Sequence, residues 1–326
     1  MARGACLLPD PDSVLSAEPV FRQPTSGHSA YLKIAEGCSR HCTYCIIPKL
    51  RGRQKSRPVE TLVAEAQALI RGGIREITLV AQETTAYGRD LQPPADLAGL
   101  LDRLAGLDPG VWVRFLYGHP ASLTPAVWET VAARPNLCPY FDIPIQHASG
   151  SLLRRMGRKY DQHDLRALFE TIRNAVPGAA LRTTVLVGFP GESETDYQCL
   201  ADFIEQVGFD HLGVFTYSDA EDLPAHGLPG HISPDVARAR MEDIMARQQR
   251  ISAANLARLR GRTLKVLVES LGADGMWRAR SQYQAPEVDG VVLIADTPGH
   301  ASLAEGCFAA VRVMETLDYD VVGEVI

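Results

Sequence analysis

The stretch Gly37-Cys38-Ser39-Arg40-His41-Cys42-Thr43-Tyr44-Cys45 places three cysteines in one short segment, with the spacing C-x3-C-x2-C. It directly follows Ala30–Ile34, an apolar run that is predicted to be a β-strand. Three thiolates in one compact loop can hold three irons of a [4Fe–4S] cluster, which usually takes four. No fourth cysteine lies nearby, so we expect one iron to remain open for a substrate or cofactor.

Two other interpretations of the cysteine loop are weaker. Structural zinc requires four closed ligands. His41 could be the fourth, but it lies between Arg40 and Cys42, and a second pair of ligands is absent. A loop of unliganded thiols is the other alternative. The isolated cysteines Cys138, Cys199 and Cys307 are expected to pack in the interior or to be inert.

Working outward from the loop, apolar strand-like runs alternate with amphipathic helical stretches. The predicted strands are Ala30–Ile34, Glu76–Ala81, Trp112–Tyr117, Tyr140–Ile145, Leu181–Val187 and His211–Tyr217. The predicted helices are Val59–Arg71, Leu97–Leu104, Pro125–Ala133, Leu152–Met156, His163–Ala175 and Glu194–Val207. Six strand–helix units imply parallel strands joined by crossover helices, and they are too few for the usual eight-stranded barrel. We therefore expect an α/β fold, a partial and open six-unit barrel, with the chemistry at the carboxyl ends of the strands.

The last fifth of the chain has a different pattern. Ser233–Arg260 is predicted to be one long helix, and short β-prone runs separated by Gly and Asp follow it. These runs are Leu264–Glu269, Gly290–Ile294, Phe308–Val313 and Asp320–Ile326. We expect three regions: a linker or domain remnant at 1–28, the partial barrel with its long helix at 29–260, and a small all-β barrel at 261–326.

Composition excludes some classes of function. The chain has 33 basic and 39 acidic residues, a net charge of −6, which argues against a polyanion binder held by bulk charge. No stretch approaches 18 consecutive apolar residues, and the N-terminal segment has no apolar signal-peptide core. We expect a cytoplasmic protein without a membrane segment.

The loop motif, with the aromatic Tyr44 before its last cysteine, resembles that of the radical S-adenosylmethionine (SAM) superfamily. That resemblance implies a partial (β/α)6 barrel and SAM bound to the open iron, where one electron cleaves it to methionine and a 5′-deoxyadenosyl radical. Longer stretches resemble the methylthiotransferase subgroup, and the all-β tail resembles its TRAM domain. These stretches are YLKIAEGCSRHCTYCIIPKLRGRQKSRP, AQETTAYG, YFDIPIQHAS and LRTTVLVGFPGE.

Two branches of the subgroup compete. Asp142-Ile143-Pro144-Ile145-Gln146-His147 and Gln82-Glu83-Thr84 resemble the RimO type, which modifies an aspartate of the small-subunit ribosomal protein numbered twelve. The alternative is the MiaB type, which modifies an adenosine of tRNA. A non-enzymatic alternative is a ribosome- or RNA-associated adaptor. Residues 261–326 carry five basic and ten acidic side chains, a net charge of −5, which favours a basic ribosomal protein as partner and makes nucleic acid less favoured.

The resemblance also implies site residues, although no catalytic residue is assigned. Cys38, Cys42 and Cys45 would bind the cluster. For SAM, Tyr44 would pack on the adenine, and Gln82 and Glu83 would hold the ammonium group. Arg182 would bind the carboxylate of SAM or form a structural salt bridge. Gly188, in a tight turn, would let the ligand approach the backbone. A basic run is expected to balance local charge rather than bind RNA; it comprises Arg40, Lys49, Arg51, Arg53, Lys55 and Arg57.

The sequence departs from the subgroup at its beginning. Members carry a further N-terminal domain whose three cysteines bind a second [4Fe–4S] cluster, where sulfur is delivered. Here only Cys6 precedes Cys38, so we expect that domain to be missing and sulfur insertion by this chain alone to be incomplete. An electron donor such as flavodoxin is implied.

Overall fold

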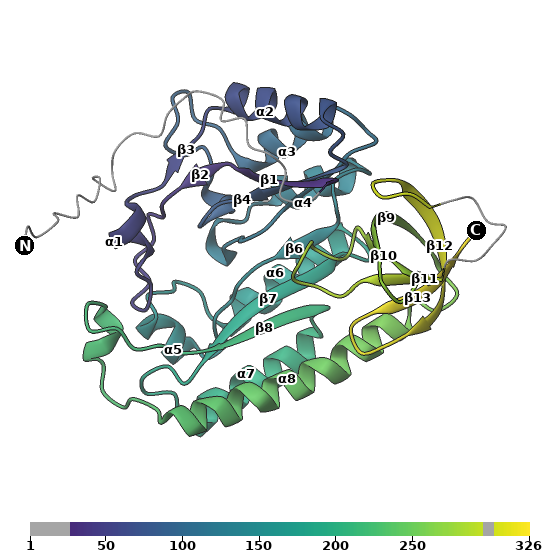
Figure 1. Ribbon diagram of the computed structural model, residues 1–326. Coiled ribbons are helices and arrows are strands. Elements are labelled where there is room, and N and C mark those ends of the chain that lie inside the picture. Colours follow the sequence, from purple (N-terminus) through teal and green to yellow (C-terminus); the bar gives the residue numbers. More distant parts are fainter. Residues whose placement is uncertain (1–26, 296–302) are drawn as a thin grey trace, which may run out of the picture.

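The computed structural model describes residues 27–295 and 303–326, and its larger part is an open barrel of parallel strands (Figure 1). The strands are β1 (Ser29–Lys33), β4 (Glu76–Val80), β5 (Trp112–Phe115), β6 (Tyr140–Asp142), β7 (Ala180–Val187) and β8 (His211–Thr216). They pair as two sheets, β1-β4-β5 and β6-β7-β8. The amides of Cys138 and Gly118 join the sheets by donating to Val113 and Asp142, each at 2.8 Å. The predicted six-unit partial barrel is thereby confirmed.

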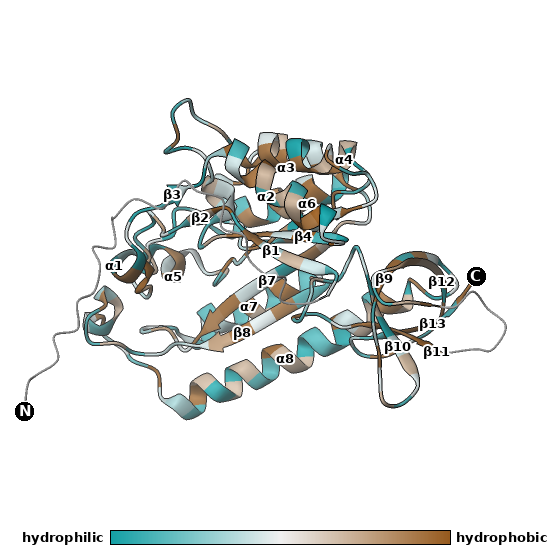
Figure 2. Ribbon diagram, turned by 45° about the horizontal axis from the view of Figure 1, so that its top comes forward, coloured by the Kyte–Doolittle hydropathy of each residue, from teal (hydrophilic) through white to brown (hydrophobic). Residues whose placement is uncertain are grey.

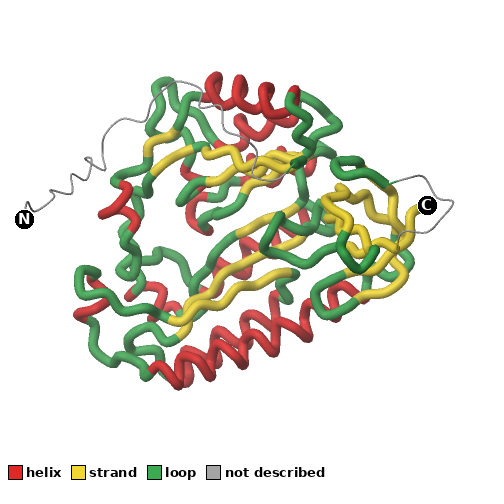
Figure 3. Tube along the Cα trace, viewed as in Figure 1, coloured by secondary structure: helices red, strands yellow, loops and turns green. Residues whose placement is uncertain are grey.

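Helices cover the outer face of the barrel, as the tube in Figure 3 shows. They are α2 (Val59–Arg71), α3 (Leu97–Ala105), α4 (Pro125–Ala133), α5 (Gly150–Arg155), α6 (Gln162–Ala175) and α7 (Glu194–Val207). Local chemistry sets their limits. The Ser193 side chain accepts from the Asp196 amide and begins α7, and Gly208, with φ 62°, ends it.

Each strand presents alternate residues to two different environments. In β4, Ile77 and Leu79 pack in the main hydrophobic core beneath the helices, whereas Glu76 and Thr78 point to the other side, into the barrel. Figure 2 shows that the strands β7 and β8 are largely apolar, whereas the outer helices also carry hydrophilic segments. Polar side chains in the barrel interior therefore need partners there.

The C-terminal part is a second, closed barrel that follows the long helix α8 (Pro234–Ala257). Its strands are β9 (Thr263–Leu271), β10 (Met276–Ser281), β11 (Val292–Ala295), β12 (Phe308–Thr316) and β13 (Val321–Val325), in the order β10-β11-β13-β12-β9. The small all-β barrel is confirmed, but β10 was not predicted. The alternation of apolar and polar residues that predicts a strand is not visible in β10, because Arg278 and Arg280 are polar and yet Arg280 is only 1% exposed.

The closed barrel seals one end of the open barrel, the end opposite α1 (Ile47–Arg51) in Figure 1. We call this closed end of the open barrel the floor. Arg280 extends from β10 into it, pairs with the buried Glu76 and donates a hydrogen bond to the Ser29 hydroxyl. Arg114 of β5 pairs with the other oxygen of Glu76. Burial alone would raise the pKa of Glu76, but the two guanidinium groups hold that pKa below its ordinary value.

Short elements flank the cysteine loop at the other end. They are β2 (Ala35–Glu36), α1, β3 (Lys55–Ser56), and three 3-10 turns, η1 (Thr84–Ala86), η2 (Pro120–Ser122) and η3 (Pro224–Gly227). No helix within the described ranges is long and apolar enough to cross a membrane. Cys6 and nearly all of the predicted linker 1–28 lie outside the described residues.

Candidate metal and cofactor site

The cysteine loop is held by backbone contacts to three separate segments. The Cys38 amide donates to the Gly52 carbonyl at 3.1 Å, the Thr43 amide donates to Met156 at 3.2 Å, and the Ala225 amide donates to Thr43 at 3.0 Å. A side chain at Gly37, with φ 79°, would lie 2.3 Å from the Arg53 carbonyl oxygen. The loop therefore has a defined conformation even though none of residues 37–45 belongs to a helix or a strand.

The three thiols of this loop are free and half-buried. Burial, with smaller contributions from the neighbouring Glu83, Cys42 and Cys45, raises the pKa of Cys38 to about 11. Thiolates that disfavour one another are stabilised by a bound cation. The donor set thus fits an iron–sulfur cluster, in which each of three irons takes one thiolate.

The structure does not support the zinc alternative. His41 is exposed, and its carbonyl oxygen, rather than its ring, is the group that packs against Gly157. Within residues 27–295 and 303–326, no three His, Cys, Asp or Glu side chains converge on a position for a single metal ion. A closed four-ligand zinc site is therefore absent from the described part of the chain.

Glu83 lies beside the first cysteine of the loop. Its carboxylate is 3.9 Å from the Cys38 sulfur and accepts two hydrogen bonds from Arg40, at 2.7 and 2.8 Å, and one from the Ser122 hydroxyl. Burial would raise the pKa of Glu83, but these donors hold it below its ordinary value. A cavity of about 210 Å³ lies between Glu83, Arg40 and Gln54. Gln82 donates to Glu36 at 3.3 Å, while its own buried carbonyl oxygen has no partner among the described residues.

Tyr44 lies in a small apolar cluster at the same end of the barrel. Its ring packs edge-on to Phe189, with 6.4 Å between ring centres. Its hydroxyl accepts a hydrogen bond from Arg158 at 2.7 Å. Any stacking of Tyr44 on an adenine stays a prediction.

Gly188 begins the turn after β7, with φ 74°. A side chain there would come within 2.5 Å of the Ala237 Cβ atom, so the close approach that requires glycine is to α8. The Gly188 amide donates to the buried Glu192, whose carboxylate also pairs with Arg240 of α8 and contacts His147 at 3.2 Å. The structure thus supplies a packing reason for this glycine.

Arg182 lies at the opposite end of the barrel from the cysteines, close to the second barrel. Its guanidinium is 3.7 Å from Asp142 and 3.5 Å from Asp289, whose side chain is 2% exposed. Asp289 also accepts from the Tyr140 hydroxyl at 2.6 Å. Of the two roles expected for Arg182, these contacts favour the structural salt bridge.

Four residues of the basic run from Arg40 to Arg57 form ion pairs with carboxylates of the protein itself. The pairs are Arg40–Glu83, Lys49–Asp222, Arg51–Glu36 and Arg57–Glu65. Arg57 and Glu65 are both nearly inaccessible to solvent. These contacts leave little of the run's charge for the cysteine loop.

Sequence reasoning missed two residues of this site, Arg158 and His119. Arg158 follows α5 and is buried beside Tyr44 and Tyr160. His119 follows β5, and its Nδ1 atom accepts from the Ala121 amide at 3.1 Å. Burial, together with Arg158 and Arg40, lowers the pKa of His119 to about 3, so the ring is neutral. The sequence could have indicated both residues, because Arg158 follows a predicted helix and His119 follows a predicted barrel strand.

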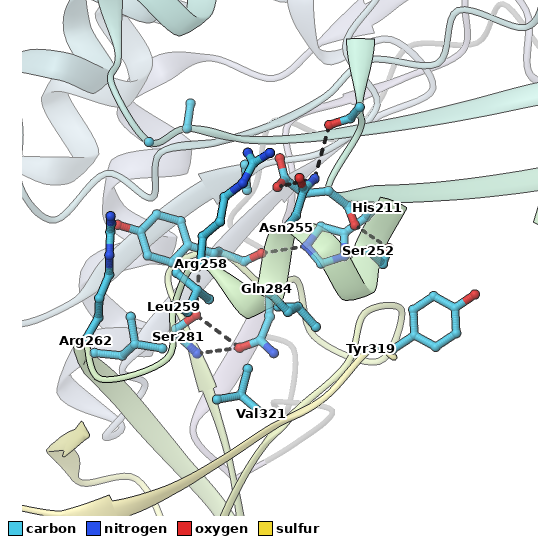
Figure 4. A pocket seen from close by; sticks show the side chains of 18 of the residues that line it. His211, Ser252, Asn255, Arg258, Leu259, Arg262, Ser281, Gln284, Tyr319 and Val321 are labelled. Atoms are coloured by element: carbon cyan, nitrogen blue, oxygen red, sulfur yellow. Dashed lines mark hydrogen bonds between the residues drawn. The ribbon is translucent and has the colours of Figure 1, made fainter. Parts of the chain in front are cut away.

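A second cavity, of about 730 Å³, lies at the junction of the two barrels and is lined by residues such as His211, Asn255, Arg258 and Gln284 (Figure 4). His211 donates toward the Tyr283 carbonyl, at 2.8 Å, across this junction. None of the predicted cluster or SAM residues lines it. We therefore place the candidate site at the cysteine end.

Comparisons with known proteins agree with this geometry. Residues 32–204 match the Radical SAM superfamily, and residues 261–326 match the TRAM domain. A protein of Desulfosudis oleivorans named ribosomal protein uS12 methylthiotransferase RimO is 50% identical over 98% of this chain and 72% of its own length. A protein of the same name from Clostridioides difficile is 42% identical over 93% of this chain and 67% of its own length.

Among solved structures, the radical SAM methyltransferase TsrM from Kitasatospora setae, with cobalamin and a [4Fe-4S] cluster bound, aligns with a TM-score of 0.53 at 17% identity. The alignment covers 64% of this chain and 43% of that one, and it bears on the fold alone. The sequence identity to the two uS12 enzymes and the two domain matches carry the assignment. The chain belongs to the radical SAM superfamily and, within it, to the RimO family of methylthiotransferases.

Proposed function

We propose that this chain uses a [4Fe–4S] cluster and SAM to methylthiolate an aspartate of ribosomal protein uS12. The observation that carries the proposal is the clamped loop of Cys38, Cys42 and Cys45 at the carboxyl ends of the strands, in a chain 50% identical to a protein named for this activity. The RimO names of these relatives also make the tRNA-modifying alternative the less favoured one.

The residues of the cysteine end have distinct proposed tasks. The three thiolates would hold the cluster, which supplies one electron for reductive cleavage of SAM. The unpartnered carbonyl oxygen of Gln82 would accept a hydrogen bond from the SAM ammonium group. Glu83, occupied by Arg40 and Ser122, would shape the wall of the site beside Cys38. Tyr44 and Gly188 would border the space that SAM occupies. Arg182 would not contact SAM and would stabilise the floor through its ion pairs.

The second barrel, residues 261–326, would dock the basic substrate protein. Its exposed acidic side chains include Glu287, Glu305, Glu315, Asp318 and Glu324, and opposite charges steer association. Asp289 lies outside this surface because it is tied to Tyr140 and Arg182. We further propose the division into 29–260 and 261–326, a cytoplasmic location and an electron donor such as flavodoxin.

The test is a reaction of the anaerobically reconstituted chain with dithionite, SAM and purified uS12. We expect 5′-deoxyadenosine and methionine to form. With sulfide added as the sulfur source, mass spectrometry should find a methylthio group on an aspartate-containing peptide of uS12, without multiple turnovers. Cys42→Ala should abolish all three products. A parallel reaction with tRNA separates the alternatives, because modification of tRNA and not of uS12 would overturn the proposal.

A further inference from the structure

Arg158 is a buried cation directly beside the cysteine loop. It is 9% exposed and donates to the hydroxyl oxygens of Tyr160, at 3.0 Å, and Tyr44, at 2.7 Å. Its Nε atom is buried without a hydrogen-bond partner among the described residues. Two neutral hydroxyl groups do not compensate a guanidinium charge, so the site is electrostatically incomplete.

Among the described residues, the other buried arginines each have a carboxylate, although nitrogens of Arg114 and Arg240 also lack a hydrogen-bond partner. Arg114 and Arg280 share Glu76, Arg57 pairs with Glu65, and Arg240 pairs with Glu192. Arg158 forms no ion pair with any residue in the ranges 27–295 and 303–326. A buried charge without a counter-charge is costly, which points to an anion that the polypeptide itself does not supply.

The surroundings of Arg158 show where that anion lies. The residues just before it hold the loop, because the carbonyl oxygens of Arg155 and Met156 accept from Thr43, and Gly157 packs against the His41 carbonyl. Tyr44, which receives the Arg158 hydrogen bond, precedes Cys45. Arg158 therefore lies beside the part of the loop that carries Cys42 and Cys45.

We infer that Arg158 is the counter-charge of the thiolate-bound cluster and raises its reduction potential; this inference rests on the proposed function. When dithionite donates one electron to the cluster, the centre gains one negative charge, and no bond in the protein forms or breaks. A fixed cation in a water-poor site stabilises the more negative, reduced state. Arg158 is a positioning residue, since its hydrogen bonds also hold Tyr44 in the loop.

The test compares Arg158→Gln with Lys159→Gln in the anaerobically reconstituted full chain without SAM. Both variants lose one positive charge from adjacent positions, but Lys159 is exposed. Iron content is measured first, and the cluster is then titrated with dithionite and followed by electron paramagnetic resonance. At a fixed potential, we expect Arg158→Gln to lower the ratio of reduced to oxidised cluster at least tenfold, about 59 mV for one electron. Lys159→Gln should match the wild type, and Arg158→Lys should lie closer to it than Arg158→Gln does.

Other results have defined meanings. A wild-type chain that binds no cluster would contradict the proposed function itself. A normal cluster with an unchanged potential in Arg158→Gln would overturn the inference alone. So would a shift that develops only when SAM is added, because the partner would then be the SAM carboxylate.

A variant that lacks the cluster is also informative. If Arg158→Gln binds no iron, Arg158→Met is compared with it by circular dichroism of the metal-free chain. If Arg158→Met is folded but binds no iron, and Arg158→Lys does bind iron, the positive charge of residue 158 is what the cluster requires, and the inference is supported. If Arg158→Met is unfolded, the role of Arg158 is structural and the inference fails.

Discussion

The two ends of the open barrel treat buried charge in opposite ways. At the floor, Glu76 is completely buried between Arg114 and Arg280, so each charge has its counter-charge within the polypeptide. At the cysteine end, Arg158 is almost as buried, but among the described residues its hydrogen bonds go to two tyrosine hydroxyl groups, and the Tyr160 ring centre lies 5.9 Å from its guanidinium carbon. The floor charges are thus paired within the folded chain, although two nitrogens of Arg114 have no hydrogen-bond partner among the described residues, whereas the charge at the cysteine end is paired by a ligand.

Ion pairs at the floor also join the second barrel to the open barrel. Arg280 and Asp289 both come from the segment 261–326 and pair with Glu76 and Arg182 of the open barrel. In one pair the second barrel supplies the cation, and in the other it supplies the anion. The two pairs together fix the orientation of the two barrels. The comparison of the two ends can be tested by removing one charge at a time.

The largest expected effect is at the cysteines. Replacing Cys38, Cys42 or Cys45 by alanine should abolish the brown chromophore and reduce bound iron from about four per chain to near zero, because each thiolate holds one iron. Iron analysis after anaerobic reconstitution measures this. Cys199→Ala is the control, and loss of iron in that variant would contradict the assignment of the ligands.

At the floor, Glu76→Gln should destabilise the protein by about 3–5 kcal/mol, because it leaves two buried guanidinium groups without their shared carboxylate. Denaturant unfolding of the metal-free chain gives this value. Glu60→Gln, which breaks the exposed pair with Arg103, is the control and should have little effect on stability, because solvent screens that pair. Equal effects of the two variants would show that the floor charges are not buried as described.

A matched pair of variants sharpens the contrast between the ends. In the metal-free chain, Arg280→Met should lower the free energy of unfolding by about 2 kcal/mol, since Glu76 and Glu269 lose a partner. Arg158→Met should leave it within about 1 kcal/mol of the wild type, because the lost hydrogen bonds are offset by removal of an uncompensated charge. Both values come from urea unfolding. A larger loss for Arg158→Met than for Arg280→Met would reverse the comparison.

A further prediction concerns the pH dependence of stability at the cysteine end. The pKa of His119 is lowered to about 3 in the folded chain, from an ordinary value of 6.5. The unfolded state therefore binds a proton that the folded state does not, and stability falls as pH drops from 6.5 toward 3, by at most about 1.4 kcal/mol per pH unit. His119→Gln should flatten this dependence in unfolding titrations of the metal-free chain. An unchanged slope in His119→Gln would refute the assignment.

The floor contributes a second dependence, at lower pH. Because the pKa of Glu76 is held below its ordinary 4.5, its stabilisation is present above that pH and is lost as the pH falls through the folded value. Glu76→Gln should remove this component. The two acid transitions can therefore be separated by the two variants.

Much of this protein was predictable from sequence because the signals are local. The spacing of Cys38, Cys42 and Cys45 predicts the cluster loop, and strand–helix alternation predicts the six-unit barrel, with Val59–Arg71, Pro125–Ala133 and Glu194–Val207 located to the residue. The small barrel was also predicted from its β-prone runs, although β10 was missed. Patterns of this kind depend on residues that are only a few positions apart, so they can be read directly from the sequence.

Only the tertiary structure decided which charges and small residues meet. Arg280 is buried because Glu76, about two hundred residues earlier in the chain, receives it, and Gly188 is required by Ala237 on a distant helix. Arg182 pairs with Asp289, and Arg158 is left beside the cysteines without a carboxylate among the described residues. Coulomb interactions and close packing depend on distance in space and on burial, and neither quantity is written in the order of the residues.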